Sequence, residues 1–167
     1  KTITVTAEAK TKVYGEVDPA LTYTFTPALI GADAFTGALA RTAGENIGKY
    51  AINQGTLALS SNYTLTYNRD SLSITKKTIT VTADAKTKVY GESDPALTYT
   101  FTPALIGADA FSGSLSRTAG ENIGTYAINQ GTLELSSNYT ITYDDDSLSI
   151  TKKTITVTAE AKTKVYG

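Results

Sequence analysis

The stretch Thr2-Ile3-Thr4-Val5-Thr6-Ala7 alternates threonine with apolar residues along its whole length. Because successive side chains of a strand point to opposite faces of a sheet, this period of two predicts a half-buried β-strand. The same six residues return at 78–83 and once more at 154–159. This element therefore predicts both the secondary structure of the chain and its organisation into copies.

A period of 76 residues organises the chain, which is 167 residues long. Residues 1–76 and 77–152 differ at only 10 positions, and residues 153–167 begin a third copy. Such a fixed period is typical of an array of similar domains. We predict one domain in residues 1–76, a second in 77–152 and a truncated third copy in 153–167. We also expect residues 154–159 to pack on the second domain as its terminal strand.

Other runs with the same alternation indicate about seven or eight short strands in each copy. In the first copy they are 21–26, 35–39, 63–67 and 72–74, with weaker runs at 50–52 and 57–59. Segments with glycine, proline or asparagine separate them and predict turns. The one stretch that could form a helical turn is 29–35, with Asp33 as its cap. The predicted fold class is all-β, with at most a short helical turn.

The differences between the copies predict which positions face solvent. Three changes to serine lie two residues apart, at Thr36, Ala38 and Ala40. A strand would place these three on one face, which we expect to be wet, with Phe35 and Leu39 on the other. Ala58 becomes Glu134 in the second copy, and a carboxylate is tolerated only where it points into solvent.

The junctions between copies contain no flexible linker. Residues 72–76 run directly into 77–81, and the second junction at 150–155 has the same sequence. Flexible linkers need residues that leave the backbone free, whereas β-branched residues stiffen an extended chain. We therefore expect coupled domains that form an elongated rod, although the paired lysines at each junction could instead mark a solvated bend.

Composition excludes several classes of function. The chain contains no Cys and no His, so the usual zinc, iron–sulfur, thiol-nucleophile and Ser-His-Asp sites cannot be built from it. Residues 1–76 carry seven basic against six acidic residues, or +1, and residues 77–152 carry five against nine, or −4. Neither copy has the basic stripe that neutralises phosphates, so we expect no nucleic-acid partner. No membrane span or signal peptide is visible, and without Met the chain is expected to be a segment of a longer protein.

Two motifs in each copy are specific enough to indicate a family. They are Tyr14-Gly15-Glu16-Val17-Asp18-Pro19-Ala20-Leu21 and Gly44-Glu45-Asn46-Ile47-Gly48-Lys49-Tyr50, and the wider match restarts at Ala85 and Ala161. Both copies closely resemble the MBG domain of the YGX type. This family occurs as tandem repeats in very large bacterial surface proteins and adhesins. The resemblance implies an extracellular, mostly β module related to the β-grasp, which serves as a stalk between an anchor and a distal binding head.

Two acidic clusters could supply oxygen ligands for Ca²⁺. One is Asp144-Asp145-Asp146, but the first copy has Asn68-Arg69-Asp70 in its place, and an arginine disfavours a cation site. The other is Glu16 with Asp18, although aspartate before proline is an ordinary turn residue. We favour solvated turns for both clusters and assign no metal ligand.

Five tyrosines of each copy could form an aromatic platform for sugars. In the first copy they are Tyr14, Tyr23, Tyr50, Tyr63 and Tyr67. Tyr23 and Tyr67 alternate with threonines, so we favour rings that face the core with their hydroxyls at its rim. Asn62 and Asn138 match the N-glycosylation pattern, which carries little weight in a bacterial protein. An isopeptide cross-link from lysine to asparagine or aspartate has no readable motif here.

We expect these features to serve a mechanical role, as stalk repeats that project a distal head from a bacterial cell. The alternative is that each repeat binds glycan or protein weakly, with repetition providing avidity. We expect no enzyme activity and assign no catalytic residue and no cofactor. The expected partners are neighbouring repeats and, through other domains, a host or matrix ligand, with no membrane contact within this fragment. The expected state is a monomer at the cell surface or secreted.

Overall fold

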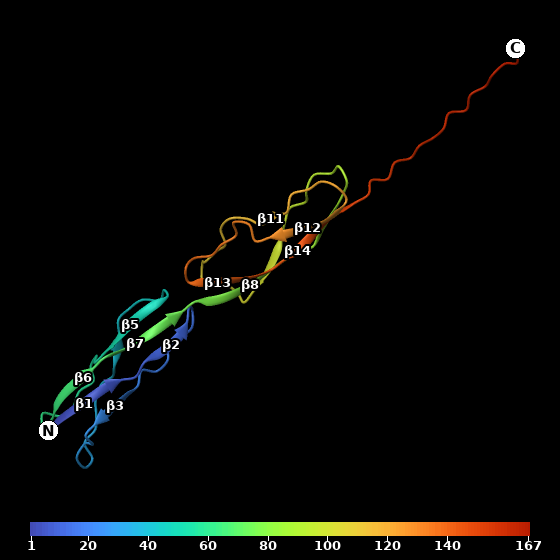
Figure 1. Cartoon of the computed structure of the whole chain (residues 1–167). Helices are drawn as coiled ribbons and strands as arrows, with labels where there is room; N and C mark the ends of the chain where they lie inside the picture. Colours follow the sequence, from blue (N-terminus) through green and yellow to red (C-terminus); the bar gives the residue numbers. More distant parts are fainter. The chain divides into compact units, whose positions relative to one another are not determined.

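The computed structural model describes residues 1–167 and contains β-strands but no helix (Figure 1). The strands of the first copy are β1 (Thr2–Ala7), β2 (Lys10–Val13), β3 (Tyr23–Thr26), β4 (Ala40–Arg41), β5 (Gly48–Asn53), β6 (Thr64–Asn68) and β7 (Asp70–Thr75). Those of the second are β8 (Lys77–Ala83), β9 (Lys86–Val89), β10 (Tyr99–Thr102), β11 (Ser116–Arg117), β12 (Gly124–Asn129), β13 (Tyr139–Asp144) and β14 (Asp146–Thr151). The predicted all-β fold class is confirmed.

The chain forms two compact units, which do not coincide with the sequence copies. The first contains Lys1–Thr80, Thr102–Phe111 and Glu134–Thr142, and the second contains Val81–Phe101, Ser112–Leu133 and Tyr143–Gly167. The whole first copy therefore lies in the first unit, together with three short segments of the second copy, 77–80, 102–111 and 134–142.

Two mixed sheets build the first copy, and each contains a parallel pair of strands. One has the order β3-β1-β6 and the other the order β2-β7-β5-β4. Strand β1 runs parallel to β6 with Ile3 opposite Leu65, and β2 runs parallel to β7 with Lys12 opposite Ile74. Since β1 and β2 follow each other closely in the chain, as do β6 and β7, the two sheets share one long parallel pairing. Sheets with the same orders, β10-β8-β13 and β11-β12-β14-β9, recur in the second copy.

The alternation in β1 directs its apolar side chains into a core. Ile3 and Val5 are fully buried, and Leu57 joins them in one hydrophobic cluster. Aromatic rings close the cluster, with Phe35 in edge contact with both Tyr23 and Phe25 at centroid distances of 5.3 and 5.0 Å. Such edge contacts are the favoured geometry of aromatic pairs.

The positions at which threonine or alanine is replaced by serine or glutamate face solvent, as predicted. Ala38, Ala40 and Ala58 are exposed, whereas Phe35 and Leu39 are partly buried against the core. This confirms the facial assignment that followed from the serine and glutamate substitutions.

Residues 35–39 and 29–35 depart from their predicted structures. The strand expected at 35–39 is reduced to a single bridge between Thr36 and Ala58. Gly37 interrupts it with φ of 73°, and a Cβ there would lie 2.1 Å from the carbonyl oxygen of Thr56. The helical turn expected at 29–35 is a simple turn in which the Asp33 N–H donates to the Ile30 carbonyl at 3.1 Å.

The expected packing of residues 154–159 as a terminal strand is wrong. No strand forms in 153–167, and Ile155 and Val157 are 81% and 89% exposed. The equivalent strand β1 pairs with β3 on one side and with β6 on the other, and both neighbours come from later in the same copy. Residues 154–159 have no such neighbours to pair with. The sequence of the third copy stops at Gly167, before any counterpart of those neighbours.

Candidate functional site: a repeated charged cluster

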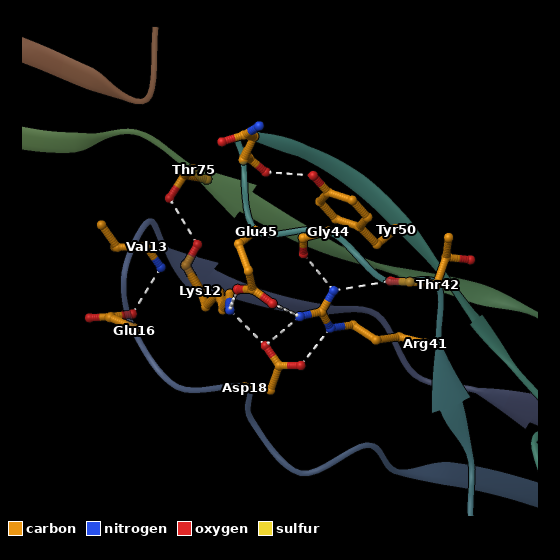
Figure 2. Close-up of polar contacts among 11 residues, drawn as sticks. Lys12, Val13, Glu16, Asp18, Arg41, Thr42, Gly44, Glu45, Tyr50 and Thr75 are labelled. Carbon is orange, nitrogen blue, oxygen red and sulfur yellow. Dashed lines mark hydrogen bonds and ion pairs between the residues drawn. The ribbon is translucent and has the colours of Figure 1, made fainter. Parts of the chain in front are cut away.

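Four charged side chains from separate segments of the first copy meet in one cluster, which we call the charged cluster (Figure 2). Lys12 Nζ donates to Asp18 Oδ1 at 2.7 Å and to Glu45 Oε2 at 2.6 Å. Arg41 donates to the same two carboxylates, reaching Asp18 Oδ1 from Nη2 at 3.1 Å. Both cations therefore share both anions. Lys12 and Arg41 are nearly buried, with 3% and 11% of their side chains exposed.

Local structure explains how these residues come together. Lys12 lies in β2 at an inward position, and Arg41 ends the short strand β4. After β2 the chain turns at Gly15, where φ is 82°, and Glu16 Oε2 accepts the Val13 N–H at 2.8 Å. This turn brings Asp18 back over Lys12.

An aromatic ring and a glycine hold the arginine in place. The Arg41 guanidinium lies over the Tyr50 ring, 5.5 Å from its centroid, and Nη1 donates to the Gly44 carbonyl at 2.6 Å. The Tyr50 hydroxyl donates to the Asn46 carbonyl at 2.8 Å. A Cβ on Gly44 would lie 2.1 Å from the Tyr50 ring, so this close approach requires glycine.

The second copy repeats the charged cluster with the same bonds. Lys88 Nζ donates to Asp94 and Glu121, both at 2.6 Å, and Arg117 binds the same two carboxylates. Arg117 also lies over Tyr126 at 5.5 Å. The arrangement is therefore a property of the repeated unit.

A model of the MBG domain (YGX type) family matches residues 3–73 and 79–149. The chain belongs to this family. Its two MBG repeats follow one another in tandem, and each matched range contains one complete charged cluster. No curated protein and no solved structure matches the chain significantly. The structure has no helix with the length and apolar character needed to cross a membrane.

The charged cluster of each MBG repeat holds its members in their ionised forms. Hydrogen bonds from Arg41, which has the larger effect, and from Lys12 lower the pKa of Asp18 from its ordinary value of 3.8 to about 2. Hydrogen bonds to Asp18, which has the larger effect, and to Glu45 raise the pKa of Lys12. Forming an amide between a lysine and a carboxyl group requires a neutral amine and a protonated acid, and both shifts oppose those states. The cluster is therefore suited to tying β2, its turn and the loop after β4 together, and unsuited to isopeptide formation.

The lowered pKa values predict a loss of stability in acid. Asp94 is shifted to about 2 by Arg117 and Lys88, as Asp18 is by its partners. A depressed folded-state pKa adds stability above the unfolded-state pKa and loses it as pH falls towards the folded value. We therefore expect the free energy of unfolding to decline as pH falls from about 4 to about 2. Urea unfolding over this range should show a flatter decline in the Asp18→Asn/Asp94→Asn double variant than in the parent.

Three carboxylates of the two acidic clusters, Glu16, Asp18 and Asp146, accept hydrogen bonds from the protein. Glu16 binds the backbone of its own turn, and Asp18 belongs to the charged cluster. Asp144 ends β13 and Asp146 begins β14, with only Asp145 between them, so the solvated turn expected there does not form. Asp146 Oδ1 accepts the Ser147 N–H at 2.7 Å. No group of three or more Asp or Glu in residues 1–167 is arranged to hold a metal ion.

The tyrosines have three separate environments. Tyr23 and Tyr67 pack against the core, as favoured from the sequence, and the Tyr67 hydroxyl donates to the Ile52 carbonyl at 3.1 Å. Tyr50 supports Arg41, while the hydroxyls of Tyr14 and Tyr63 each donate to an aspartate. Of the two glycosylation motifs, Asn62 is exposed, whereas Asn138 is only 8% exposed.

Proposed function

We propose that the two MBG repeats are a mechanical spacer in an extracellular bacterial protein, holding a distal binding head away from the cell. The observation that carries this proposal is the parallel pairing of the strands by which the chain enters and leaves each repeat. In the first repeat β1 and β2 pair in parallel with β6 and β7, and in the second β9 pairs in parallel with β14.

Parallel pairing determines how tension acts on a repeat. Force on the two ends pulls β1 towards its N-terminus and β7 towards its C-terminus. The two long segments are then sheared along their length, so the evenly spaced hydrogen bonds of the parallel ladder share the load. Rupture requires many of these bonds to break together. The charged cluster adds a contact outside this ladder, because Asp18 accepts hydrogen bonds from both Lys12 of β2 and Arg41 of β4.

The connection between the repeats supports transmission of force. Strand β7 ends at Thr75 and β8 begins at Lys77, so only Lys76 separates them. A one-residue connection has almost no length to take up before tension reaches the next repeat. Location at a bacterial surface is part of the proposal and rests on the family resemblance. No catalytic role is proposed, because the charged cluster offers only ionised, mutually bonded groups.

Single-molecule force spectroscopy tests the proposal. Pulled through its ends, the chain should give two unfolding events of high and similar force. Each event should release at most about 25–27 nm of chain, less the folded length of one 76-residue repeat. Rates of forced unfolding follow the barrier to unfolding, so the force distribution reports it directly.

The pulling direction provides the matched control. The substitutions Lys49→Cys and Thr75→Cys provide attachment points at the same end of the antiparallel pair of β5 and β7. Force applied there would peel the two strands apart one hydrogen bond at a time. The chain contains no other cysteine to compete. We expect a much lower force in this direction. Equal forces in the two directions would refute the mechanical proposal.

A further inference from the structure

Side chains of the two repeats meet inside the first compact unit. The Tyr14 ring packs edge-on against Tyr139, with a centroid distance of 5.3 Å and an interplanar angle of 81°. The hydroxyls of Tyr14 and Tyr139 both donate to Asp109 Oδ2, at 3.0 and 2.6 Å. Burial and the bond to Asp109 raise the pKa of Tyr139 to about 12, so its hydroxyl stays protonated as a donor.

A second set of contacts lies in the same unit. The Ile47 N–H donates to Asn138 Oδ1 at 3.0 Å, and Asn138 Nδ2 donates to Asn46 Oδ1 at 2.9 Å. Gly15 is covered by Ile106, which would lie 2.4 Å from a Cβ at that position. Apolar packing and satisfied hydrogen bonds therefore occur together, as in a specific interface.

These contacts define two complementary surfaces of a repeat. The docking tip comprises Tyr14, Gly15, Asn46 and Ile47 in the first repeat and Tyr90, Gly91, Asn122 and Ile123 in the second. The receiving end comprises Ile106, Asp109, Asn138 and Tyr139 in the second repeat and Ile30, Asp33, Asn62 and Tyr63 in the first. The residue types of each surface are identical in the two repeats.

One docking tip and one receiving end lack such a partner, and their apolar residues are exposed. Tyr90 and Ile123 of the second docking tip are 48% and 53% exposed, and Ile30 of the first receiving end is 62% exposed. In contrast, Tyr139 of the occupied receiving end is 4% exposed. Contiguous exposed apolar residues rimmed by polar groups are typical of interaction sites.

The unpartnered receiving end already has the geometry of the occupied one. The Tyr63 hydroxyl donates to Asp33 Oδ2 at 2.7 Å and accepts the Ile30 N–H at 3.0 Å. The corresponding bonds of Tyr139 measure 2.6 and 2.9 Å. A surface formed before binding avoids the cost of ordering it during binding. Asp109 Oδ2 accepts hydrogen bonds from both Tyr139 and Tyr14. The equivalent Asp33 Oδ2 accepts one from Tyr63, so it is placed to accept a second from the tyrosine of a docking tip.

We propose that the docking tip at Tyr90, Asn122 and Ile123 binds the receiving end at Ile30, Asp33 and Tyr63 of another copy of this chain. The occupied pair within the chain shows that the two surfaces fit. Because they are different surfaces, the contact is head to tail and adds copies in series without closing into a symmetric dimer. The expected monomer thus becomes a concentration-dependent chain of monomers. This inference does not depend on the mechanical role.

Cysteine cross-linking tests the proposal and exploits the absence of native cysteine. One chain carries Asn122→Cys and another, distinguishable by mass, carries Asn62→Cys, since the equivalent Asn46 and Asn138 touch within the chain. After mixing and mild oxidation, we expect the mixed disulfide to be several-fold more abundant than random pairing gives. Adding Tyr90→Ala to the first chain should return the products to random proportions. Random pairing without that substitution would overturn the proposal.

Sedimentation velocity provides a second readout that needs no cross-link. The sedimentation coefficient of the parent chain should rise with concentration, and the rise should be lost in Tyr90→Ala. This substitution removes a half-exposed ring and leaves the fold intact, which circular dichroism would verify. A coefficient that shows no rise in the parent would overturn the proposal, as would an unchanged rise in the variant.

Discussion

Replacing Ile3 by alanine should lower the free energy of unfolding of the first repeat by about 3–4 kcal/mol, within the range for buried isoleucine. Ile3 is fully buried in β1, the middle strand of its sheet, and packs with Val5 and Leu57. Truncation removes apolar surface from this contact and leaves a cavity that two flanking strands cannot easily close. Urea unfolding followed by circular dichroism, with native-state hydrogen exchange to assign the affected repeat, measures the loss.

The chain supplies two matched controls for this substitution. Ile79 occupies the same place in the second repeat and is also fully buried, so Ile79→Ala should cost a similar amount there. Ile155 lies in the same local sequence but is 81% exposed, so Ile155→Ala should leave stability unchanged. A measurable loss at Ile155 would mean that residues 153–167 pack in solution.

The contrast between Ile3 and Ile155 shows what the local sequence can predict. The alternation of residues 2–7 correctly predicts a strand and its inward face, because a period of two leaves only one way to bury the apolar side chains. Identical residues at 154–159 form no strand. The local pattern determines which face of the strand is apolar. Burial of that face also requires neighbouring strands, which residues 154–159 lack.

Strand partners were less accessible to prediction than strand positions. The parallel pairing of β1 with β6 joins Thr2 to Thr64, far apart in the chain, and no local pattern specifies it. Strand β2 lacks the apolar alternation that predicts a strand, because lysine occupies its inward position. The charge of Lys12 is compensated by carboxylates 6 and 33 residues away, which lie in two separate loops, so no local pattern marks Lys12 as inward-facing.

Asp18→Asn should destabilise the first repeat by about 2 kcal/mol, whereas Lys12→Met should cost less than about 1 kcal/mol. Removing the charge of Asp18 leaves the nearly buried Lys12 ammonium with only Glu45 as an anion and deprives Arg41 of a partner. The cost falls below the 3–5 kcal/mol typical of a fully buried pair because 40% of the Asp18 side chain remains exposed. In Lys12→Met, the methionine side chain instead fills the volume of the lysine stem. Asp18 and Glu45 then keep their hydrogen bonds to Arg41 and their exposure to solvent.

Equilibrium urea unfolding of the two variants at neutral pH separates two roles for the charged cluster. A larger loss in Asp18→Asn would mean that the carboxylates chiefly compensate a buried cation and fix the path of the turn after β2. A larger loss in Lys12→Met would contradict this, because it would show that the ammonium itself provides net stability. The distinction matters for a mechanical spacer, since a cluster that fixes the path of the chain would still resist shear in the Lys12→Met variant. Force spectroscopy of that variant should therefore give unfolding forces close to those of the parent.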